Sequence, residues 1–486
     1  MAVLNIVLLQ TESLVARLTV TKRIGEDEML AIAERVGDSP SARSYTLKDF
    51  LHGSDRFTLA ERAISIYLLL LPLLWATGLM LPSAILVVFG IFAMSISAGS
   101  SLSYALPWFA VGMSQIISVS LNLLVGAESA ALLLKHCVSS YVLGWFMLGC
   151  ALGIGASGQI RPFVMLSNVV WLSRYVLILS IPAYVLALFL PQESLFILSP
   201  IGHLIPEHFA ARNFSFGMFI YNWEEFDGRL FPRLSVLFPW PTAMGTAGIC
   251  VVFISACAEA KKERLVGMVG GIVMVIASMG RIAALTLIAC SLIRLLMKLK
   301  IRTAVVVLGL VVASVSVFVI TQQANIDDLA ESTLQKVSNT REGASQVRDA
   351  VYEASWKGFD AKPWFGNGWP GEPLFDNDQV FQTSGVMVVG SHSTVSGLLY
   401  KGGAITFALF VIAFILTAIH VVRRSQFTNQ KNTICILLAL ASTCVGEGLE
   451  SLVLPLVFAF VWIGIAIAYP KRLQISATCD PVHDLS

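Results

Sequence analysis

The stretch "GLLYKGGAITFALFVIAFILTAIH", Gly397–His420, is almost wholly apolar and is long enough to cross a bilayer as a helix of about 20 residues. Similar apolar runs recur along the 486-residue chain, separated by short polar gaps. The chain is 56% hydrophobic and only 13% charged, whereas soluble domains are about 25% charged. Because no series of short alternating segments occurs, a transmembrane barrel is disfavoured. The sequence therefore predicts a polytopic helical membrane protein.

We expect an all-α fold of about twelve transmembrane helices, with a large external loop that carries amphipathic helices. The parts, in chain order, are a cytoplasmic extension 1–62, helices 1–5 in 63–191, a first external loop 192–241, helices 6–9 in 242–321, a large external loop 322–395, helices 10–12 in 396–470 and a cytoplasmic tail 471–486. The expected spans are 64–80, 83–98, 104–125, 138–157, 174–191, 242–258, 265–280, 282–297, 303–321, 397–420, 432–449 and 453–469. Because an arginine at the bilayer centre costs about 2.5–3.5 kcal/mol, Arg174 is placed at a membrane boundary and residues 160–173 are expected to lie along the interface.

Basic residues in the short loops set the orientation. The clusters in 261–264, 298–302, 423–431 and 471–472 all fall on one side of the twelve-span arrangement. Cytoplasmic loops carry an excess of Lys and Arg, so this side and both termini are expected in the cytoplasm. The net charge is only +2, and no basic patch is interleaved with aromatic residues, which excludes a nucleic-acid partner.

Three basic residues then fall on the external side, close to the membrane surface. Arg281 is at the tip of a hairpin of two short spans, Arg348 is in the large loop, and His392 directly precedes span 397–420. Cations gathered beside a membrane cavity point to an anionic ligand, and a lipid-linked diphosphate is the anion found at that depth. Guanidinium groups bind phosphate oxygens bidentately, and a neutral histidine accepts a proton from a hydroxyl.

Each of these residues also has a structural interpretation. Arg281 fits a helix-end arginine that reaches the lipid headgroups, although Gly280 and Ala283 beside it favour close packing. Arg348 fits an exposed arginine paired with a neighbouring carboxylate, on a segment whose periodicity predicts an amphipathic helix followed by a tight loop, "KPWFGNGWPG". His392 fits a helix-start histidine between two serines. Taken singly, each residue is explained by its structural role. An anion-binding site is favoured only when the three basic residues are considered together.

Further polar residues lie on the same predicted side. Arg229 and Arg233 precede the sixth span and are candidates for phosphate or glycan contact, as is Arg341 in the large loop. Glu447 and Glu450 are three residues apart and share a helix face. These two carboxylates either hold the arginines in place or mark a hydrated turn.

The sequence resembles the O-antigen ligase/polymerase superfamily of bacterial membrane glycosyltransferases over about 230–420. The motifs that carry the resemblance are "RLSVLFPWPTAMG" (233–245), "SMGRIAAL" (278–285), "VRDAVYEASWKGFDAKPWFGNG" (347–368) and "SHSTVSGLLYKGGAITFALF" (391–410). The two family arginines correspond to Arg281 and Arg348, the family histidine to His392, and an earlier arginine to Arg233. The chain departs from the family pattern at Thr242, Ser393 and Val395. These departures leave the three basic residues intact and concern the contacts that the resemblance implies for the acceptor.

The resemblance implies a metal-independent, inverting glycosyltransferase with no cofactor. Its donor would be an undecaprenyl-diphosphate-linked glycan and its acceptor a glycan or lipid-linked glycan, with the active site on the periplasmic face of the bacterial inner membrane. Arg281, Arg348 and His392 are the implied catalytic residues. The substrate-binding candidates are Arg229, Arg233, Arg341, Glu447 and Glu450.

The favoured activity is polymerisation of repeat units into a surface polysaccharide or exopolysaccharide, because two sizeable external loops are available to hold two glycan chains. One alternative is ligation of the glycan to lipopolysaccharide core or protein. Another is a lipid-linked sugar flippase, which predicts charged residues near the middle of spans. Expected partners are membrane lipids, a chain-length regulator and a flippase.

Overall fold

The computed structural model describes residues 57–96, 101–124, 137–190, 194–205, 216–226, 229–297, 342–369, 389–390, 393–424, 430–449 and 453–468, in part by their backbone alone. All of them belong to one unit, Tyr45–Tyr469. Several expectations lie outside the described residues: the extension up to residue 56, the span 303–321, the tail 471–486, and the candidates Arg341, His392 and Glu450.

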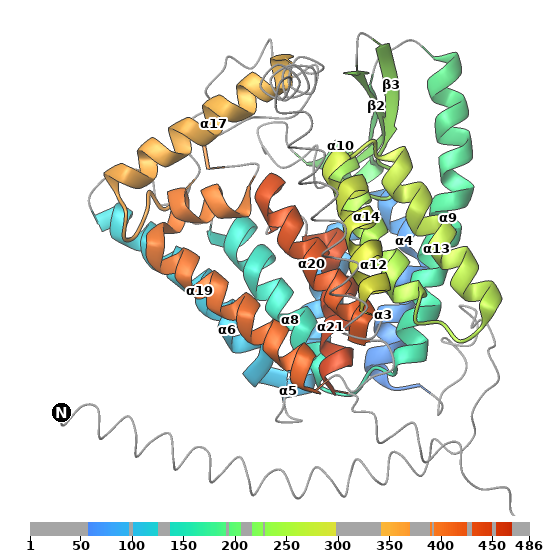
Figure 1. The fold of residues 1–486 in the computed structure, drawn as a ribbon, viewed down its shortest axis with the longest axis horizontal. Coiled ribbons are helices and arrows are strands. Elements are labelled where there is room, and N and C mark those ends of the chain that lie inside the picture. The colour runs from blue at the N-terminus through green and yellow to red at the C-terminus, as the bar shows by residue number, and fades with distance from the viewer. Residues whose placement is uncertain are drawn as a thin grey trace, which may run out of the picture. The chain divides into compact units, whose positions relative to one another are not determined.

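Long apolar helices make up most of the described chain (Figure 1). The first group is α3 (Leu59–Leu69), α4 (Leu71–Thr77), α5 (Met80–Ile96), α6 (Ser101–Leu124), the π-helix η1 (Cys137–Phe146), α8 (Met147–Ala156) and α9 (Pro162–Phe189). The second group is α12 (Pro241–Ser255), α13 (Lys261–Ala277), α14 (Arg281–Leu296), α19 (Thr394–Arg424), α20 (Gln430–Gly446) and α21 (Val453–Ala468). Every expected span except 303–321 coincides with one or two of these helices.

Three of the described helices are long and apolar enough to cross a membrane: α6, α9 and α19. Helices α3 and α4 form a fourth candidate as a pair bent by 58°, where Pro72 at the start of α4 cannot continue the α3 hydrogen bonds. The apolar helices α5, α8, α12 and α21 are shorter. The chain is thus a mostly helical membrane protein, and the number of twelve spans stays a prediction.

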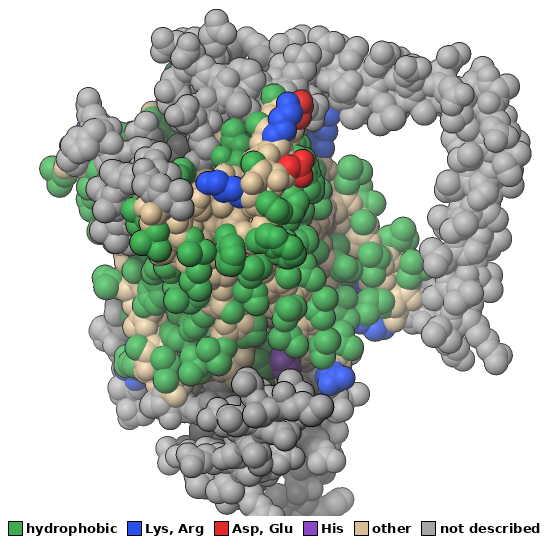
Figure 2. Space-filling view, turned by 90° about the vertical axis from the view of Figure 1, so that its left-hand side faces the viewer, with side chains coloured by type: hydrophobic (Ala, Val, Ile, Leu, Met, Phe, Trp, Pro, Cys, Tyr) green, Lys and Arg blue, Asp and Glu red, His purple; other side chains and the backbone are tan. Residues whose placement is uncertain are grey.

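The surface is consistent with a lipid boundary. Figure 2 shows hydrophobic side chains covering the middle of one face, with the charged side chains above and below them. On α19 the exposed residues Ile412, Ile415, Ile419 and Val422 follow helical spacing, so one face of this helix presents an apolar stripe. The opposite face packs inward, where Trp108 of α6 stacks on Trp145 and donates its indole N–H to Thr417 Oγ1 at 3.1 Å.

Two sequence expectations are wrong here. Residues 160–173 do not form a separate interfacial segment, because α9 runs unbroken from Pro162 to Phe189 with Arg174 inside it. The Arg174 guanidinium lies 4.4 Å from the centre of the Trp171 ring, and this cation–π contact offsets part of the cost of its position.

The second incorrect expectation concerns residues 192–241, which were expected to form a polar loop. This region contains regular secondary structure, including a β-sheet, so the chain is not strictly all-α. Its described residues contain a short helix, α10 (Pro200–Leu204), and an antiparallel sheet of β1 (Leu195–Leu198), β2 (Gly217–Phe226) and β3 (Arg229–Leu234) in the order β1-β2-β3. The pair Phe226–Arg229 closes the β2–β3 ladder, and "DG" lies between these residues in the sequence. Asp-Gly between two β-rich runs is a strong hairpin signal, and it was available before the structure.

The helices have two distinct ends (Figure 1). At one end lie the sheet, α17 (Glu342–Ala361), the turn Ser278–Gly280 and the start of α19. We call this the sheet end. At the other end, the opposite end, lie the start of α13 and the start of α9. Helix α17 agrees with the amphipathic helix expected from the sequence, since Val351 and Ser355 are buried while Trp356 is half exposed.

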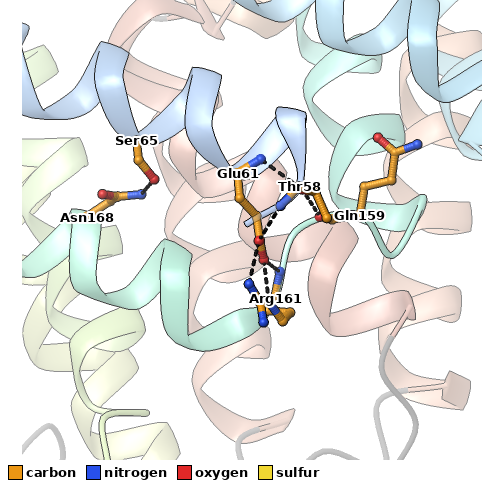
Figure 3. Close-up of polar contacts among 6 residues, drawn as sticks. All are labelled: Thr58, Glu61, Ser65, Gln159, Arg161 and Asn168. Atoms are coloured by element: carbon orange, nitrogen blue, oxygen red, sulfur yellow. Dashed lines mark hydrogen bonds and ion pairs between the residues drawn. The ribbon is translucent and has the colours of Figure 1, made fainter. Parts of the chain in front are cut away.

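A buried ion pair fixes the opposite end (Figure 3). Thr58 caps α3 in a reciprocal capping box with Glu61, whose carboxylate is fully buried. Arg161, which precedes α9, donates to that carboxylate through Nε and Nη2, both at 2.7 Å, and through its backbone N–H at 2.9 Å. Thr58 also bonds the carbonyl of Gln159 at 2.8 Å. The carboxylate therefore joins the start of α3 to the start of α9.

Candidate functional site

Arg233 connects the sheet to the membrane helices. It lies on β3 opposite Asn222 of β2, and it is largely buried. Its Nε donates to the carbonyl oxygen of Ser278 at 2.9 Å. Ser278 belongs to the short connection between α13 and α14, so this bond holds the sheet against the helical hairpin that carries Arg281.

The hairpin tip has the form that the sequence predicted. Helix α13 ends at Ala277 and α14 begins at Arg281, so that only Ser278–Gly280 join them. Ser278 is buried, its Oγ donates to the carbonyl of Val275, and the same Oγ accepts from the Gly280 N–H. Met279 has a positive φ of 51°, a conformation that is uncommon for a residue with a side chain. These contacts set the direction in which α14 leaves the turn, with the partly exposed Arg281 as its first residue.

Helix α20 joins α14 to the start of α19. A side chain at Gly446, the last residue of α20, would collide with Ile282 of α14. One turn earlier, Ser442 Oγ lies 2.7 Å from Thr286 Oγ1 of α14. The end of α20 is therefore packed directly against the first turns of α14.

The residues that follow His392 are bound to this same part of α20. Ser393 Oγ donates to the Cys444 carbonyl at 3.2 Å. The backbone N–H and Oγ1 of Thr394 both lie 3.0 Å from the Glu447 carbonyl oxygen, and Thr394 Oγ1 accepts from the Leu449 N–H at 2.7 Å. The start of α19 is thus placed beside the hairpin tip. The segment ends next to His392 in sequence, and His392 itself lies outside the described residues.

Helix α17 contacts the chain on the other side of His392. Ser355 Oγ accepts a hydrogen bond from the Gly390 N–H at 2.9 Å and donates to the Val351 carbonyl at 2.6 Å. Arg348 occupies the helical positions three before Val351 and seven before Ser355, which are both buried. In the sequence of α17, Arg348 is therefore spaced by helical intervals from these two residues. Its side chain lies outside the described residues.

Several helices present their N-termini at the sheet end. Helices α12, α14 and α19 begin there, at Pro241, Arg281 and Thr394. A helix N-terminus carries a partial positive charge and unsatisfied N–H groups. Together with Arg233 and Arg281, these termini make the local electrostatic environment favourable to an anion.

At the sheet end the pKa values of Tyr221 and Glu353 are shifted, for different reasons. Burial raises the pKa of Tyr221, which lies on β2 opposite Leu234. On α17, the hydrogen bond and charge of Lys357 lower the pKa of Glu353, and the two groups are 2.7 Å apart. This pair lies on the exposed face of α17, away from Val351 and Ser355.

The structure describes some of the candidate residues predicted from the sequence, and others lie outside the described residues. Arg233 bonds the turn that directly precedes Arg281, and the helix that carries Arg348 contacts Gly390, two residues before His392. Glu447 accepts hydrogen bonds at its carbonyl, so its described contact is a backbone one, and the proposed carboxylate role stays a prediction. The side chain of Arg229 and the whole of Arg341, His392 and Glu450 lie outside the described residues. Among the described residues no group of three or more His, Cys, Asp or Glu side chains could hold a metal ion.

Sequence reasoning did not single out Lys401, Lys362 or Asn122. Lys401 is only 4% exposed within α19, and it could have been recognised as a charge inside an apolar run. Lys362 Nζ donates to Asn122 Oδ1 at 2.6 Å, across 240 positions of the chain. No local sequence signal indicates that pair.

Residues 266–411 match the family described as O-antigen ligase, a span that includes the hairpin tip, α17 and the first part of α19. No curated protein matches the chain significantly. Members of this family are glycosyltransferase-like membrane enzymes, and the family implies a lipid-linked glycan donor and an acceptor. The match over residues 266–411 supports the resemblance of this chain to the O-antigen ligase/polymerase superfamily.

Proposed function

We propose that this protein is a metal-independent, inverting glycosyltransferase that polymerises undecaprenyl-diphosphate-linked oligosaccharides at the outer face of the bacterial inner membrane. The family match supports the enzyme class and the lipid-linked donor. The observation that carries the site is the assembly of the sheet end. There, Arg233 binds the turn before Arg281, and α20 joins that turn to the residues following His392.

In the proposed reaction, the acceptor hydroxyl oxygen attacks the anomeric carbon of the donor sugar. The bond from that carbon to the diphosphate oxygen breaks, undecaprenyl diphosphate leaves with the electron pair, and the sugar configuration inverts. His392 takes the hydroxyl proton, a role that contributes about 10²–10⁴-fold. Arg281 and Arg348 bind the diphosphate oxygens and stabilise the charge that grows on them. The leaving diphosphate needs no protonation, so no carboxylic general acid is required.

The distribution of basic residues supports the orientation. Lys261, Lys262 and Arg264 lie at the start of α13, and Arg423 and Lys431 flank the α19–α20 connection, all at the end opposite to the sheet. Under the positive-inside rule the opposite end faces the cytoplasm. The sheet end, with the proposed site, then faces the periplasm, where a chain-length regulator and a flippase are candidate partners.

A reconstituted reaction tests this proposal. Purified full-length protein in proteoliposomes is given an undecaprenyl-diphosphate-linked oligosaccharide, and release of undecaprenyl diphosphate and growth of the glycan are measured with and without EDTA. We expect equal rates in both, and NMR of the new linkage should show inversion at the anomeric carbon. Retention of configuration, loss of activity in EDTA, or absence of diphosphate release would each contradict the mechanism.

Ligation is a second candidate, and the description of the matched family favours it. It shares the chemistry and differs in acceptor, which would be lipopolysaccharide core or a protein. The glycan in a deletion strain separates the two activities. Single repeat units identify a polymerase, whereas long chains that stay unattached identify a ligase.

A further inference from the structure

Helix α19 is broken inside the membrane segment. At Gly403 the backbone has φ 68° and ψ −173°, so the helix divides into residues 394–402 and 404–424. Such a break removes helical hydrogen bonds, and non-helical backbone at membrane depth is stable only where protein groups or water satisfy it. The break therefore needs partners from elsewhere in the chain.

The segment Lys362–Gly368, which we call the wedge loop, provides those partners. It directly follows α17, and its backbone bonds to both halves of α19. The bonds are Asn367 N to Tyr400 O at 2.8 Å, Gly368 N to Lys401 O at 2.8 Å, Ala404 N to Pro363 O at 2.7 Å and Ile405 N to Trp364 O at 3.4 Å. Gly366 has φ 65°, and a side chain there would collide with the backbone of Lys401–Gly403. The wedge loop thus fits the break in a single register.

Asn122 of α6 holds the wedge loop from the other side. The Asn122 side chain is buried, and its amide group acts both as a hydrogen-bond donor and as an acceptor. Nδ2 donates to the carbonyls of Gly366 at 3.1 Å and Ser118 at 2.9 Å, while Oδ1 accepts from Lys362 Nζ at 2.6 Å. One side chain therefore binds the loop at its middle and at its junction with α17.

Other side chains complete the attachment. Ser118 Oγ donates to the carbonyls of Phe365 and Lys401, and the Tyr141 hydroxyl donates to the Gly368 carbonyl. The wedge loop is consequently bonded to α6, η1 and both halves of α19. Since α17 ends at Ala361, one residue before the loop, the position of α17 is set by the same bonds.

We propose that Asn122 is a positioning residue of the transfer reaction. It acts by holding the wedge loop in the break of α19, which fixes α17, the helix that carries Arg348, against the start of α19. This inference rests on the proposed function for its catalytic part. Its mechanical part, that Asn122 orders α17, rests on the bonds of Asn122 to Gly366 and Lys362 alone.

The chain offers a matched control for a purely structural role. Ser114 Oγ lies 2.9 Å from Thr406 Oγ1, so another polar contact joins α6 to α19 two turns from Asn122. That contact does not involve the wedge loop. Because Thr406 Oγ1 also donates to the Gly402 carbonyl at 2.8 Å, across the break, the control removes the contact from the Ser114 side only. If any link between α6 and α19 served equally well, disrupting either pair would have the same effect.

The experiment compares Asn122→Leu, Lys362→Met, their double variant, and the control Ser114→Ala, which disrupts the control pair Ser114–Thr406. All are studied as full-length protein in proteoliposomes. Two quantities are measured: the rate against donor concentration, and hydrogen exchange of the α17 amides. We expect Asn122→Leu to lower kcat at least tenfold and to speed α17 exchange, with similar membrane content. The control pair should change kcat less than twofold and leave α17 exchange unchanged.

The double variant and a conservative variant sharpen the test. Lys362→Met added to Asn122→Leu should lower kcat no further, because both remove the same attachment. Asn122→Asp keeps the acceptor for Lys362 but loses the donor to Gly366, so an intermediate kcat and intermediate exchange are expected.

The outcomes separate this inference from the proposed function. Unchanged α17 exchange in Asn122→Leu, or equal effects of the control pair, overturns the positioning role while the wild type stays active. If the wild type does not turn over the lipid-linked donor, the proposed function fails and the catalytic part falls with it. Faster α17 exchange in Asn122→Leu would still support the mechanical part in that case.

Discussion

Each end of this molecule contains a largely buried arginine, and the partners of the two differ. At the opposite end, Arg161 binds the fully buried carboxylate of Glu61 bidentately, through Nε and Nη2. At the sheet end, the Nε of Arg233 donates to a neutral backbone carbonyl, that of Ser278. Removal of Arg161 leaves the buried Glu61 carboxylate without its counter-charge, whereas removal of Arg233 leaves the Ser278 carbonyl without this donor. We infer that Arg161 mainly stabilises the fold, while Arg233 positions the turn that precedes Arg281.

The largest effect is expected from the proposed base at the sheet end. Replacement of His392 by alanine should lower glycan transfer by about 10²-fold or more, since the acceptor proton loses its base. The matched control is His420→Ala at the far end of the same helix, where the ring packs 5.1 Å from that of Tyr104. Transfer by the control should be nearly normal. Near-normal polymer in His392→Ala, at equal membrane content, would refute the catalytic role.

Arg348→Ala is expected to have a comparable effect, because it removes one of the two groups proposed to stabilise the diphosphate. The readout is the release of undecaprenyl diphosphate in single-turnover measurements, which reports the chemical step. Lys357→Met is its control on the same helix, since Lys357 lies on the exposed face and pairs with Glu353. An equal loss of diphosphate release in both variants would mean that only the overall positive charge of α17 matters. Arg348 would then have no specific role in the reaction.

At the opposite end, Arg161→Met should destabilise the fold by about 3–5 kcal/mol, because it leaves the buried Glu61 carboxylate without its counter-charge. Arg264→Met is the control, since Arg264 lies at the same end but donates only to the carbonyls of Ala258 and Glu259. Because Arg264 is exposed and water can replace it as donor, that variant should cost about 1 kcal/mol or less. Thermal unfolding in detergent gives both values, and equal losses would remove the distinction between the two kinds of partner.

Arg233→Met should separate stability from activity at the sheet end. The lost hydrogen bond to the Ser278 carbonyl by itself costs about 1.5–3 kcal/mol. We expect transfer to fall about tenfold, because the Ser278 turn no longer holds Arg281 in place. A stability loss larger than that of Arg161→Met, with normal transfer in the folded fraction, would assign Arg233 to the structure alone.

Local sequence patterns were sufficient for much of the fold. Apolar runs predicted the helices, and the short connection "SMG" predicted a hairpin with Arg281 at its tip, as found. The polar composition of 192–241 favours a loop, whereas the hairpin of β2 and β3 is indicated only by Asp227-Gly228 between two β-rich runs. The cost of a lone arginine places Arg174 at a helix end, but its contact with Trp171 allows α9 to continue through it.

Tertiary pairings could not be predicted in this way. Gly402-Gly403 inside a span indicates a weak point in the helix, but nothing local shows that residues 363–368 fill it. The bond between Lys362 and Asn122 joins positions far apart in sequence, and so do the bonds of Ser393 and Thr394 to the end of α20. Motif spacing therefore identified candidate residues for the site, whereas their common location depends on the packing of α20 and the wedge loop.

The smallest effect is expected on the exposed face of α17. Lys357 holds the pKa of Glu353 below its ordinary value of 4.5, so the pair stabilises the helix above that pH and loses its contribution as pH falls through the lowered pKa. In Lys357→Met the Glu353 pKa should return toward 4.5, as followed by NMR of labelled glutamate. Transfer at neutral pH should stay unchanged, because the pair is exposed and solvent screens its charges. A substantial fall in transfer would place the exposed face of α17, rather than the stripe of Val351 and Ser355, against the substrate.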